Sequence, residues 1–318
     1  MGGRAMSKKR SPVAGTKKES LWQSICKHKG LYFMALPGFI WFILFKYIPL
    51  AGSVIAFMDY DIYKGIGGSK FAGLKHFEHF FKFPEFGEVF RNTAILGAYE
   101  VLIVFPIPIV LAILMNEVRN AKYKKAVQTA VYVPHFLSWV IIGGIFTTLL
   151  SPNTGVINNF RQMLGLDSIY YMASEKHIRG ILVIASIWKE MGWSSIVYLA
   201  AIAGIDPALY EAAEIDGANR FRRMLNITLP TILPIIMTML LLKVGNFMEI
   251  GFEKTNSFMN SMNQGRIDVF DTFVYRYGLQ NLQYSYATAV GLFKSIVGII
   301  LLFISNAISR KTTDQSII

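Results

Sequence analysis

The sequence predicts an all-α membrane protein with six transmembrane helices. Of its 318 residues, 53% are hydrophobic and the mean hydropathy is +0.41, which is more apolar than a soluble protein of this length would be. Six apolar runs each approach the ~20 residues that a helix needs to cross the hydrocarbon layer. A polar segment, residues 204–230, separates the fourth run from the fifth.

The six runs define the expected domain organisation. They cover residues 31–57, 93–116, 130–150, 180–203, 230–250 and 286–308. We therefore expect a basic cytoplasmic tail over 1–30, a six-span domain over 31–308 and a cytoplasmic C-terminal tail over 309–318. The first run is about twice as long as the apolar part of a cleaved signal peptide, so we interpret it as a retained span.

Prolines lie inside or at the ends of several runs. They are Pro37, Pro49, Pro106, Pro108, Pro134 and Pro234. A membrane helix tolerates proline where neighbouring groups satisfy the carbonyl that the ring leaves free. Kinked helices are therefore expected rather than six straight ones.

The net charge of +12 is concentrated ahead of the first run. Eight of the 32 Lys and Arg residues precede residue 30, and this position favours a cytoplasmic anchor over a nucleic-acid-binding tail. An even number of spans puts both termini on one side of the membrane. With both termini inside, the inner segments hold 17 Lys and Arg residues and the outer segments hold 11, which supports this orientation.

The chain lacks the motifs of a nucleotide-hydrolysing or metal enzyme. Gly-Lys does not occur as a dipeptide, so there is no phosphate-binding loop of the form G-x-x-x-x-G-K-[ST]. H-E-x-x-H and G-x-S-x-G are also absent. The five histidines are scattered, and the single cysteine, Cys26, excludes a disulfide framework. We expect no catalytic residue, no metal site and no cofactor in this chain.

Polar residues within the apolar runs are candidates for lining a solute path. A charge at the centre of a bilayer is costly unless it faces protein or water. The candidates in the two runs that flank the polar segment are Lys189, Trp193, Lys243, Asn246 and Glu249. An excess of lysine along a path favours an anionic solute.

These residues also have structural interpretations. A lysine near an interface can extend its charge into the headgroup region. Glu249 lies close to the end of the fifth run and could be solvated surface, and Lys189 and Glu190 could pair structurally with other helices. The sequence leaves both interpretations open.

Residues 204–230 have the pattern of two short helices lying on the membrane surface. Asp206 can cap the first helix, and Pro207 suits its first position, where the missing N–H has no intrahelical partner. The expected elements are a first helix over 208–214, a break at Gly217, a second helix over 218–225 and an end at Pro230.

Seven positions of this segment match a pattern of fixed spacing, E-A-A-x3-G-x9-I-x-L-P. They are Glu211, Ala212, Ala213, Gly217, Ile227, Leu229 and Pro230. The pattern resembles the signature of the permease subunits of binding-protein-dependent ABC importers. The resemblance implies that the segment is a cytoplasmic coupling loop, which docks on a separate ATPase subunit and transmits its motion to the spans.

The resemblance also gives each matched residue a role. The glutamate would offer a carboxylate to a basic group of the ATPase, the two alanines would allow close backbone approach, and the glycine would permit the bend. The last three residues would fix the loop against the fifth span. An interfacial amphipathic helix without a partner is the alternative.

Partners and location follow from the same resemblance. It implies a second, non-identical permease subunit that completes the path, a dimer of ATPase subunits that holds ATP and Mg, and an extracytoplasmic solute-binding protein. The location would be the bacterial cytoplasmic membrane. Residues 131–136, 271–279 and 284–293 are similar to the branch that imports complex oligosaccharides. The lysines in the spans favour an acidic, uronate-containing oligosaccharide.

Other functions remain open from the residues alone. An ABC permease for another small solute would carry the same coupling segment. An ion-coupled secondary transporter would need neither that segment nor a partner, and its uptake would collapse with the ion gradient. An enzyme acting within the membrane would show a paired nucleophile and base, and none is apparent in the sequence.

Overall fold

The computed structural model describes residues 27–313, with side chains described up to residue 310. The tail expected over 1–30 therefore lies mostly outside the described residues, as does most of the expected C-terminal tail. Among the described residues the regular structure is helical except for one antiparallel sheet, in which β1 (Met58–Asp59) pairs with β2 (Lys70–Phe71). The chain divides into two compact units, Met1–Ser53 and Val54–Ile318.

The described part of the first unit is one apolar helix. Its elements are α2 (Lys29–Phe42), the π-helical turn η1 (Ile43–Tyr47) and α3 (Ile48–Gly52). None of these elements contains a buried residue. Together with the 3-10 turn η2 (Ser53–Phe57) they form the first candidate membrane span.

The second unit contains the remaining elements in the following order. The part that precedes the polar segment contains β1, α4 (Gly65–Gly68), β2, α5 (Lys75–Lys82), α6 (Phe86–Tyr99), η3 (Glu100–Val104), α7 (Pro106–Glu117), α8 (Ala121–Tyr132), η4 (Val133–Phe136), α9 (Trp139–Leu149), α10 (Val156–Met163), η5 (Tyr171–Ala173) and α11 (Ile178–Ala203). The remaining elements are α12 (Pro207–Ile215), α13 (Arg220–Arg223), η6 (Met224–Thr228), α14 (Leu229–Gly245), α15 (Phe252–Phe258), α16 (Gln264–Ile267), α17 (Phe270–Val274), η7 (Tyr275–Gln280) and α18 (Tyr284–Thr313).

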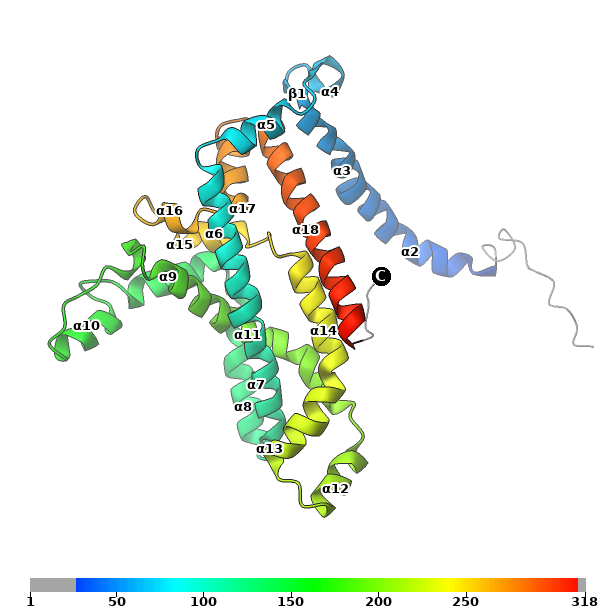
Figure 1. Ribbon diagram of the computed structural model, residues 1–318, viewed down its shortest axis with the longest axis vertical. Coiled ribbons are helices and arrows are strands. Elements are labelled where there is room, and N and C mark those ends of the chain that lie inside the picture. Colours follow the sequence, from blue (N-terminus) through cyan, green and yellow to red (C-terminus); the bar gives the residue numbers. More distant parts are fainter. Residues whose placement is uncertain (1–26, 314–318) are drawn as a thin grey trace, which may run out of the picture. The chain divides into compact units, whose positions relative to one another are not determined.

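Six segments of the described chain can cross a membrane by length and composition. Four are long helices, Lys29–Phe57, Phe86–Glu117, Arg220–Gly245 and Tyr284–Arg310, and two are bent helix pairs, Ala121–Phe136 with Trp139–Leu149 and Ile178–Ala203 with Pro207–Ile215. Each predicted apolar run overlaps one of the six, which confirms the predicted architecture. In Figure 1, α12 lies at one end of the second unit, and α5 and the sheet lie at the other.

Three of the prolines follow π-helical turns within continuous helices. η1, η3 and η6 each end two residues before a proline, namely Pro49, Pro106 and Pro230. In an α-helix the proline ring clashes with the carbonyl four residues earlier, and here that carbonyl belongs to the middle residue of the wider π turn. Pro230 therefore does not end the polar segment as expected, because the helix continues through it from Arg220 to Gly245.

The third predicted span is broken rather than continuous. Its two halves meet at an angle of 106°. Pro134 lies in the 3-10 turn η4, and Ser138 caps α9 by accepting a hydrogen bond from the N–H of Ile141 at 3.3 Å. A proline followed by a serine cap ends one helix and begins another.

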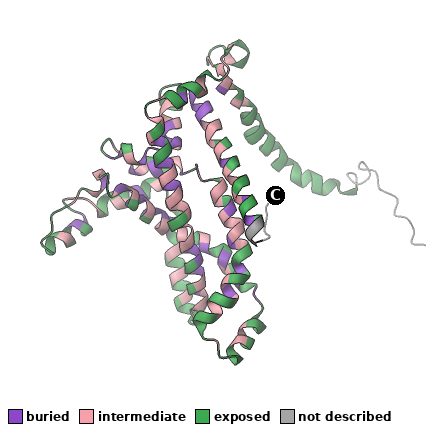
Figure 2. Cartoon of the chain, in the orientation of Figure 1, coloured by how far each residue is buried: buried purple, intermediate pink, exposed green. Residues whose placement is uncertain are grey.

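Three buried clusters hold the second unit together. One surrounds the first half of α11 and includes Leu182 and Phe258, and a second is aromatic and includes Phe80 and Phe273. The third joins α7, α11 and α14. Figure 2 shows the buried residues along these packed helices, whereas α12 contains none. The polar segment thus projects from a packed bundle.

Candidate functional site

In the polar segment, the first helix and the turn form as predicted. Asp206 Oδ1 accepts a hydrogen bond from the N–H of Ala208 at 2.9 Å, which caps α12. Gly217 has a φ of +75°, a conformation that glycine adopts readily at the end of a helix. The N–H of Ala218 then bonds to the carbonyl of Ala213 at 2.8 Å, and closes the turn.

Two side-chain contacts join the halves of this segment. Arg223 Nη1 donates to Glu214 Oε2 at 2.8 Å, and the hydroxyls of Tyr210 and Thr228 are 2.9 Å apart. Ile227 and Leu229 pack against the cluster that joins α7, α11 and α14. These contacts tie α12 to the start of the fifth span.

The outward surface of α12 is left without internal partners. Glu211 makes no ion pair or side-chain hydrogen bond with any of the residues 27–313, and Ala212 beside it is exposed. Ile215 is 87% exposed, and Leu209 and Phe221 are also exposed. An exposed carboxylate among exposed apolar side chains is typical of a surface that binds another protein.

A second group of polar residues lies inside the bundle, where three helical elements bring an ion cluster together. Lys243 Nζ on α14 donates to Glu100 Oε2 at 2.7 Å, and Lys254 Nζ on α15 donates to Glu100 Oε1. Glu100 begins the π turn η3. One carboxylate therefore serves two ammonium groups.

Lys189 has a different environment from Lys243. Its Nζ donates to the carbonyls of His135 at 2.7 Å and Leu137 at 2.5 Å. Both carbonyls lie at the break in the third span, where regular helical hydrogen bonds are missing. Lys189 is buried, so the structure places its ammonium group at the kink, 5.5 Å from the centre of the Trp139 ring.

Trp193 lies one helical turn from Lys189 and is backed by His135. The two rings are parallel, with centroids 4.5 Å apart, and the indole is 46% exposed. His135 Nδ1 also lies 3.4 Å from Glu190 Oε2. This arrangement holds the indole in one orientation while its other face stays accessible.

The ion cluster and the indole share a cavity of about 400 Å³. Its polar lining residues are Glu100, Glu190, Trp193, Ser194, Lys243 and Asn246. The remaining lining is mostly apolar, and a mostly apolar pocket with a few convergent polar groups is typical of a ligand site. Three of the predicted path residues, Trp193, Lys243 and Asn246, thus meet in one cavity.

Two predicted path residues lie beyond the end of the helix that forms the fifth span. α14 ends at Gly245, so Asn246 only caps it and Glu249 follows in the connection to α15. Glycine and asparagine are weak helix formers, which accounts for the earlier end. The Glu249 side chain is 62% exposed and lies 3.9 Å from Lys294 Nζ. The expected span over 230–250 is therefore wrong at its C-terminal end.

Lys254 is the cluster residue that the sequence did not indicate. It lies beyond the fifth apolar run, in a segment expected to be an outer loop. The structure folds this segment back into the bundle, where the Lys254 side chain is only 8% exposed. No local sequence signal distinguishes it, because its partner Glu100 is 154 residues away.

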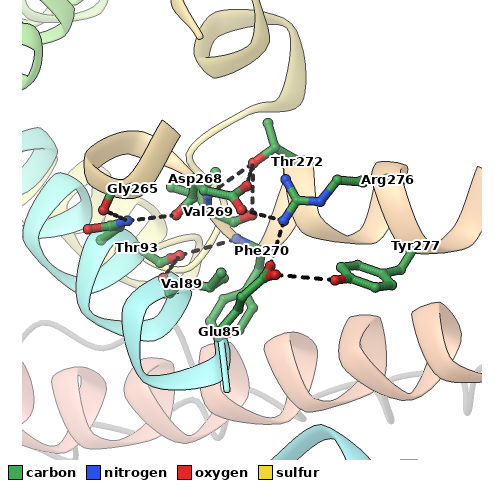
Figure 3. A network of polar contacts seen from close by, with 11 residues as sticks. Glu85, Val89, Thr93, Gly265, Asp268, Val269, Phe270, Thr272, Arg276 and Tyr277 are labelled. Atoms are coloured by element: carbon green, nitrogen blue, oxygen red, sulfur yellow. Dashed lines mark hydrogen bonds and ion pairs between the residues drawn. The ribbon is translucent and has the colours of Figure 1, made fainter. Parts of the chain in front are cut away.

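A polar network holds the rest of that segment against α6 (Figure 3). Arg276 Nη2 lies 2.9 Å from Glu85 Oε2 and 2.5 Å from Asp268 Oδ2. Burial disfavours the charged guanidinium, but the hydrogen bond and charge of Asp268 outweigh this effect and raise the pKa of Arg276. Asn92 Nδ2 donates to the carbonyls of Gly265 and Asp268, both at 3.1 Å. The network fixes the region of α16 and α17 against α6.

The described residues contain no cluster of three or more His, Cys, Asp or Glu side chains suited to a metal ion.

Comparison with known proteins identifies the family. The model of the binding-protein-dependent transport system inner membrane component matches residues 108–314. The chain belongs to this family.

Curated relatives extend the similarity to nearly the full chain. The polygalacturonan/rhamnogalacturonan transport system permease protein YteP of Bacillus subtilis is 46% identical over 95% of this chain and 94% of its own length. The protein LplB of the same species is 44% identical over 98% of both chains. The arabinooligosaccharides transport system permease protein AraP of Bacillus subtilis is 26% identical over 94% of this chain and 95% of its own length.

Solved structures of this family share the fold. A crystal structure of a bacterial ABC transporter involved in the import of the acidic polysaccharide alginate contains a chain that matches with a TM-score of 0.85 and 42% identity, over 93% of this chain and 100% of that chain. A second structure, the alginate transporter in complex with an alginate pentasaccharide-bound periplasmic protein, matches with a TM-score of 0.86 and 41% identity, over 94% of this chain and 100% of that chain.

Membership of the family defines the general role of the chain. It is a multi-pass permease subunit of an ABC importer in the plasma membrane, and it is a transport subunit rather than an enzyme. Its two polar regions, the coupling segment and the cavity with the ion cluster, are therefore candidates for the two tasks of such a subunit.

Proposed function

We propose that this chain forms half of the translocation path of an ATP-driven importer for acidic oligosaccharides. The observation that carries the proposal is the excess of positive charge inside the bundle. Lys243 and Lys254 share a single carboxylate there, that of Glu100. A buried charge without a counter-ion is costly, and a path with an excess of cations favours an anionic solute.

The relatives support the same substrate class. Polygalacturonan and rhamnogalacturonan, which the name of one relative contains, are built partly or wholly from uronate sugars, and alginate is called acidic in the description of the matching structure. The arabinooligosaccharide permease is less similar, at 26% identity. The proposal is therefore an oligosaccharide that carries carboxylates.

The coupling segment supports the ATP-driven mechanism. Glu211 and the exposed apolar residues around it would dock in a groove of an ATPase subunit, and the contacts of Tyr210 and Arg223 would transmit the motion. The chain would hold no nucleotide itself, because ATP and Mg would bind to the ATPase dimer. The segment and both termini would lie in the cytoplasm.

Two further partners complete the proposed importer. A second, related permease subunit would form the other half of the path. An extracytoplasmic binding protein would deliver the oligosaccharide, as suggested by the alginate transporter, which was captured with an alginate pentasaccharide-bound periplasmic protein. The binding protein would dock at the end of the bundle that holds α5 and the sheet, opposite α12.

The test is uptake by the complete importer in lipid vesicles. Two probes of equal chain length suffice, an oligogalacturonate and its uncharged methyl ester. We expect ATP-dependent uptake that prefers the acid and that continues after an ionophore collapses the ion gradients. Preference for the ester would contradict the acidic substrate, and loss of uptake with the ionophore alone would contradict the ATP-driven mechanism.

A further inference from the structure

The two lysines that share Glu100 differ in their access to the cavity. The Lys254 side chain is 8% exposed and the Lys243 side chain is 39% exposed. Each lysine holds its own oxygen of the carboxylate, Oε1 for Lys254 and Oε2 for Lys243. The contact between Lys243 and Glu100 can therefore break while the contact between Lys254 and Glu100 stays intact.

We infer that Glu100 is a resident counter-ion, and that Lys243 exchanges it for a carboxylate of the oligosaccharide during import. This inference rests on the proposed acidic substrate. In the empty path Glu100 neutralises Lys243, and in the loaded path a substrate carboxylate takes that position. When the sugar leaves, Glu100 returns to Lys243, so the site releases its ligand rather than retaining it.

Lys254 makes this exchange possible. Separating a buried ion pair normally leaves an uncompensated charge, which is strongly unfavourable. Here Glu100 keeps Lys254 as a partner when Lys243 turns to the substrate. The indole of Trp139, 5.8 Å from Lys254 Nζ, adds a cation–π contact to the ammonium group. Neither state of the exchange therefore contains an unpaired carboxylate.

The rest of the cavity suits a sugar ring. Trp193 offers an accessible aromatic face, and His135 supports it from behind. Ser194 and Asn246 add polar groups near Lys243. A volume of about 400 Å³ is at the small end of ligand pockets, so the cavity would contact part of an oligosaccharide rather than all of it.

The first test removes the exchanging lysine. Lys243→Met is assembled into the complete importer, and uptake of the oligogalacturonate and of its methyl ester is measured against concentration. We expect the KM for the acid to rise about tenfold, so that the preference for acid over ester falls by the same factor, because a charge-assisted hydrogen bond is lost. Co-purification with the ATPase confirms assembly of the variant.

The second test removes the competitor and leaves Lys243 in place. Glu100→Gln alone would leave Lys254 without its partner. The double variant Glu100→Gln/Lys254→Met avoids this problem because it removes one charge of each sign. The accessible lysine then lacks a resident counter-ion. We expect the KM for the acid to fall several-fold, opposite to the effect of Lys243→Met, with a slower maximal rate because release is harder.

A matched control comes from another ion pair in the bundle. Lys294 Nζ lies 2.5 Å from Asp271 Oδ1 and lines other cavities, so Lys294→Met/Asp271→Asn should leave the acid-to-ester preference within twofold of the wild type. Equal changes for both probes in Lys243→Met would overturn the inference. So would a double variant whose KM for the acid rises or stays the same. A wild-type importer that takes up both probes equally would instead contradict the proposed substrate class.

Discussion

The coupling segment and the intramembrane ion cluster hold their carboxylates in opposite environments. On α12, Glu211 is exposed and has no partner among the described residues, whereas Glu100 lies inside the bundle and holds two lysines. The first carboxylate is available to another chain. The second is satisfied internally and becomes available only when one partner is displaced. The difference matches the two proposed roles, a surface for protein contact and a site that handles a small charged ligand.

The two regions also differ in how far apart their residues are in sequence. The two side-chain contacts that join the halves of the coupling segment span at most 18 residues, the longer being that between Tyr210 and Thr228. The ion cluster joins residues that are 143 and 154 positions apart. The first region can therefore change shape as one local unit, while the second depends on how three helical elements pack. Substitutions should affect stability mainly in the second region and coupling mainly in the first.

The largest effect is expected from Glu100→Gln. It leaves Lys243 and Lys254 without a counter-ion, and removing one partner of a buried ion pair costs about 3–5 kcal/mol. Denaturant unfolding of the purified chain in detergent would measure the loss. Glu190→Gln is the control, since its carboxylate is partly exposed and its one ion pair among the described residues is with His135, and it should cost less than about 1 kcal/mol. Similar losses in both variants would argue against a special role for Glu100.

A smaller loss is expected from Lys189→Met. The two carbonyls at the break in the third span would lose their donor, at a cost of about 2–3 kcal/mol. The same unfolding measurement applies, with Lys176→Met as a control because this exposed lysine makes no ion pair or side-chain hydrogen bond among the described residues. Lys189→Met should also leave the acid-to-ester preference unchanged. A changed preference would place Lys189 in the solute path rather than at the kink.

Gly217→Ala is expected to act on coupling more than on stability. At a φ of +75°, any side chain costs about 1–2 kcal/mol, although no atom stands in the way of an added Cβ. Gly165 has a φ of +73° and equally open space, but lies outside the coupling segment. Both variants should lose similar stability, whereas only Gly217→Ala should weaken co-purification of the ATPase. Equal weakening by Gly165→Ala would point to a global effect of strain.

The smallest effect on stability is expected from Glu211→Gln. Its carboxylate has no internal partner, so unfolding should shift by less than about 0.5 kcal/mol. Binding of the ATPase should nevertheless weaken about tenfold, as expected for the loss of one charge-assisted contact between proteins. Glu214→Gln is the matched control, because that carboxylate is already engaged by Arg223. If both variants bind the ATPase equally well, Glu211 is not the contact.

The sequence indicated the parts of the fold that depend on composition and local spacing. Runs of apolar residues predicted the six spans, and the cap at Asp206 and the glycine at 217 predicted the turn of the coupling segment. Fixed spacing from Glu211 to Pro230 indicated the family, because the matched pattern lies within one short segment and needs no knowledge of the fold.

Other features depend on packing that the sequence does not reveal. Pro230 was expected to end a segment, but the π turn η6 accommodates it within a continuous helix. Lys254 follows the fifth apolar run and gave no sign that it would be buried beside Glu100. Lys189 was correctly placed in the fourth span, yet its partners are backbone carbonyls at a break that only the folded chain defines.

The division of tasks between the two regions can be tested in one measurement. Uptake of the oligogalacturonate and its methyl ester is followed against concentration for importers that carry either Glu211→Gln or Lys243→Met. We expect Glu211→Gln to lower Vmax for both probes with little change in KM, and Lys243→Met to raise the KM for the acid alone. Two variants that change the same kinetic constant for both probes would contradict the account.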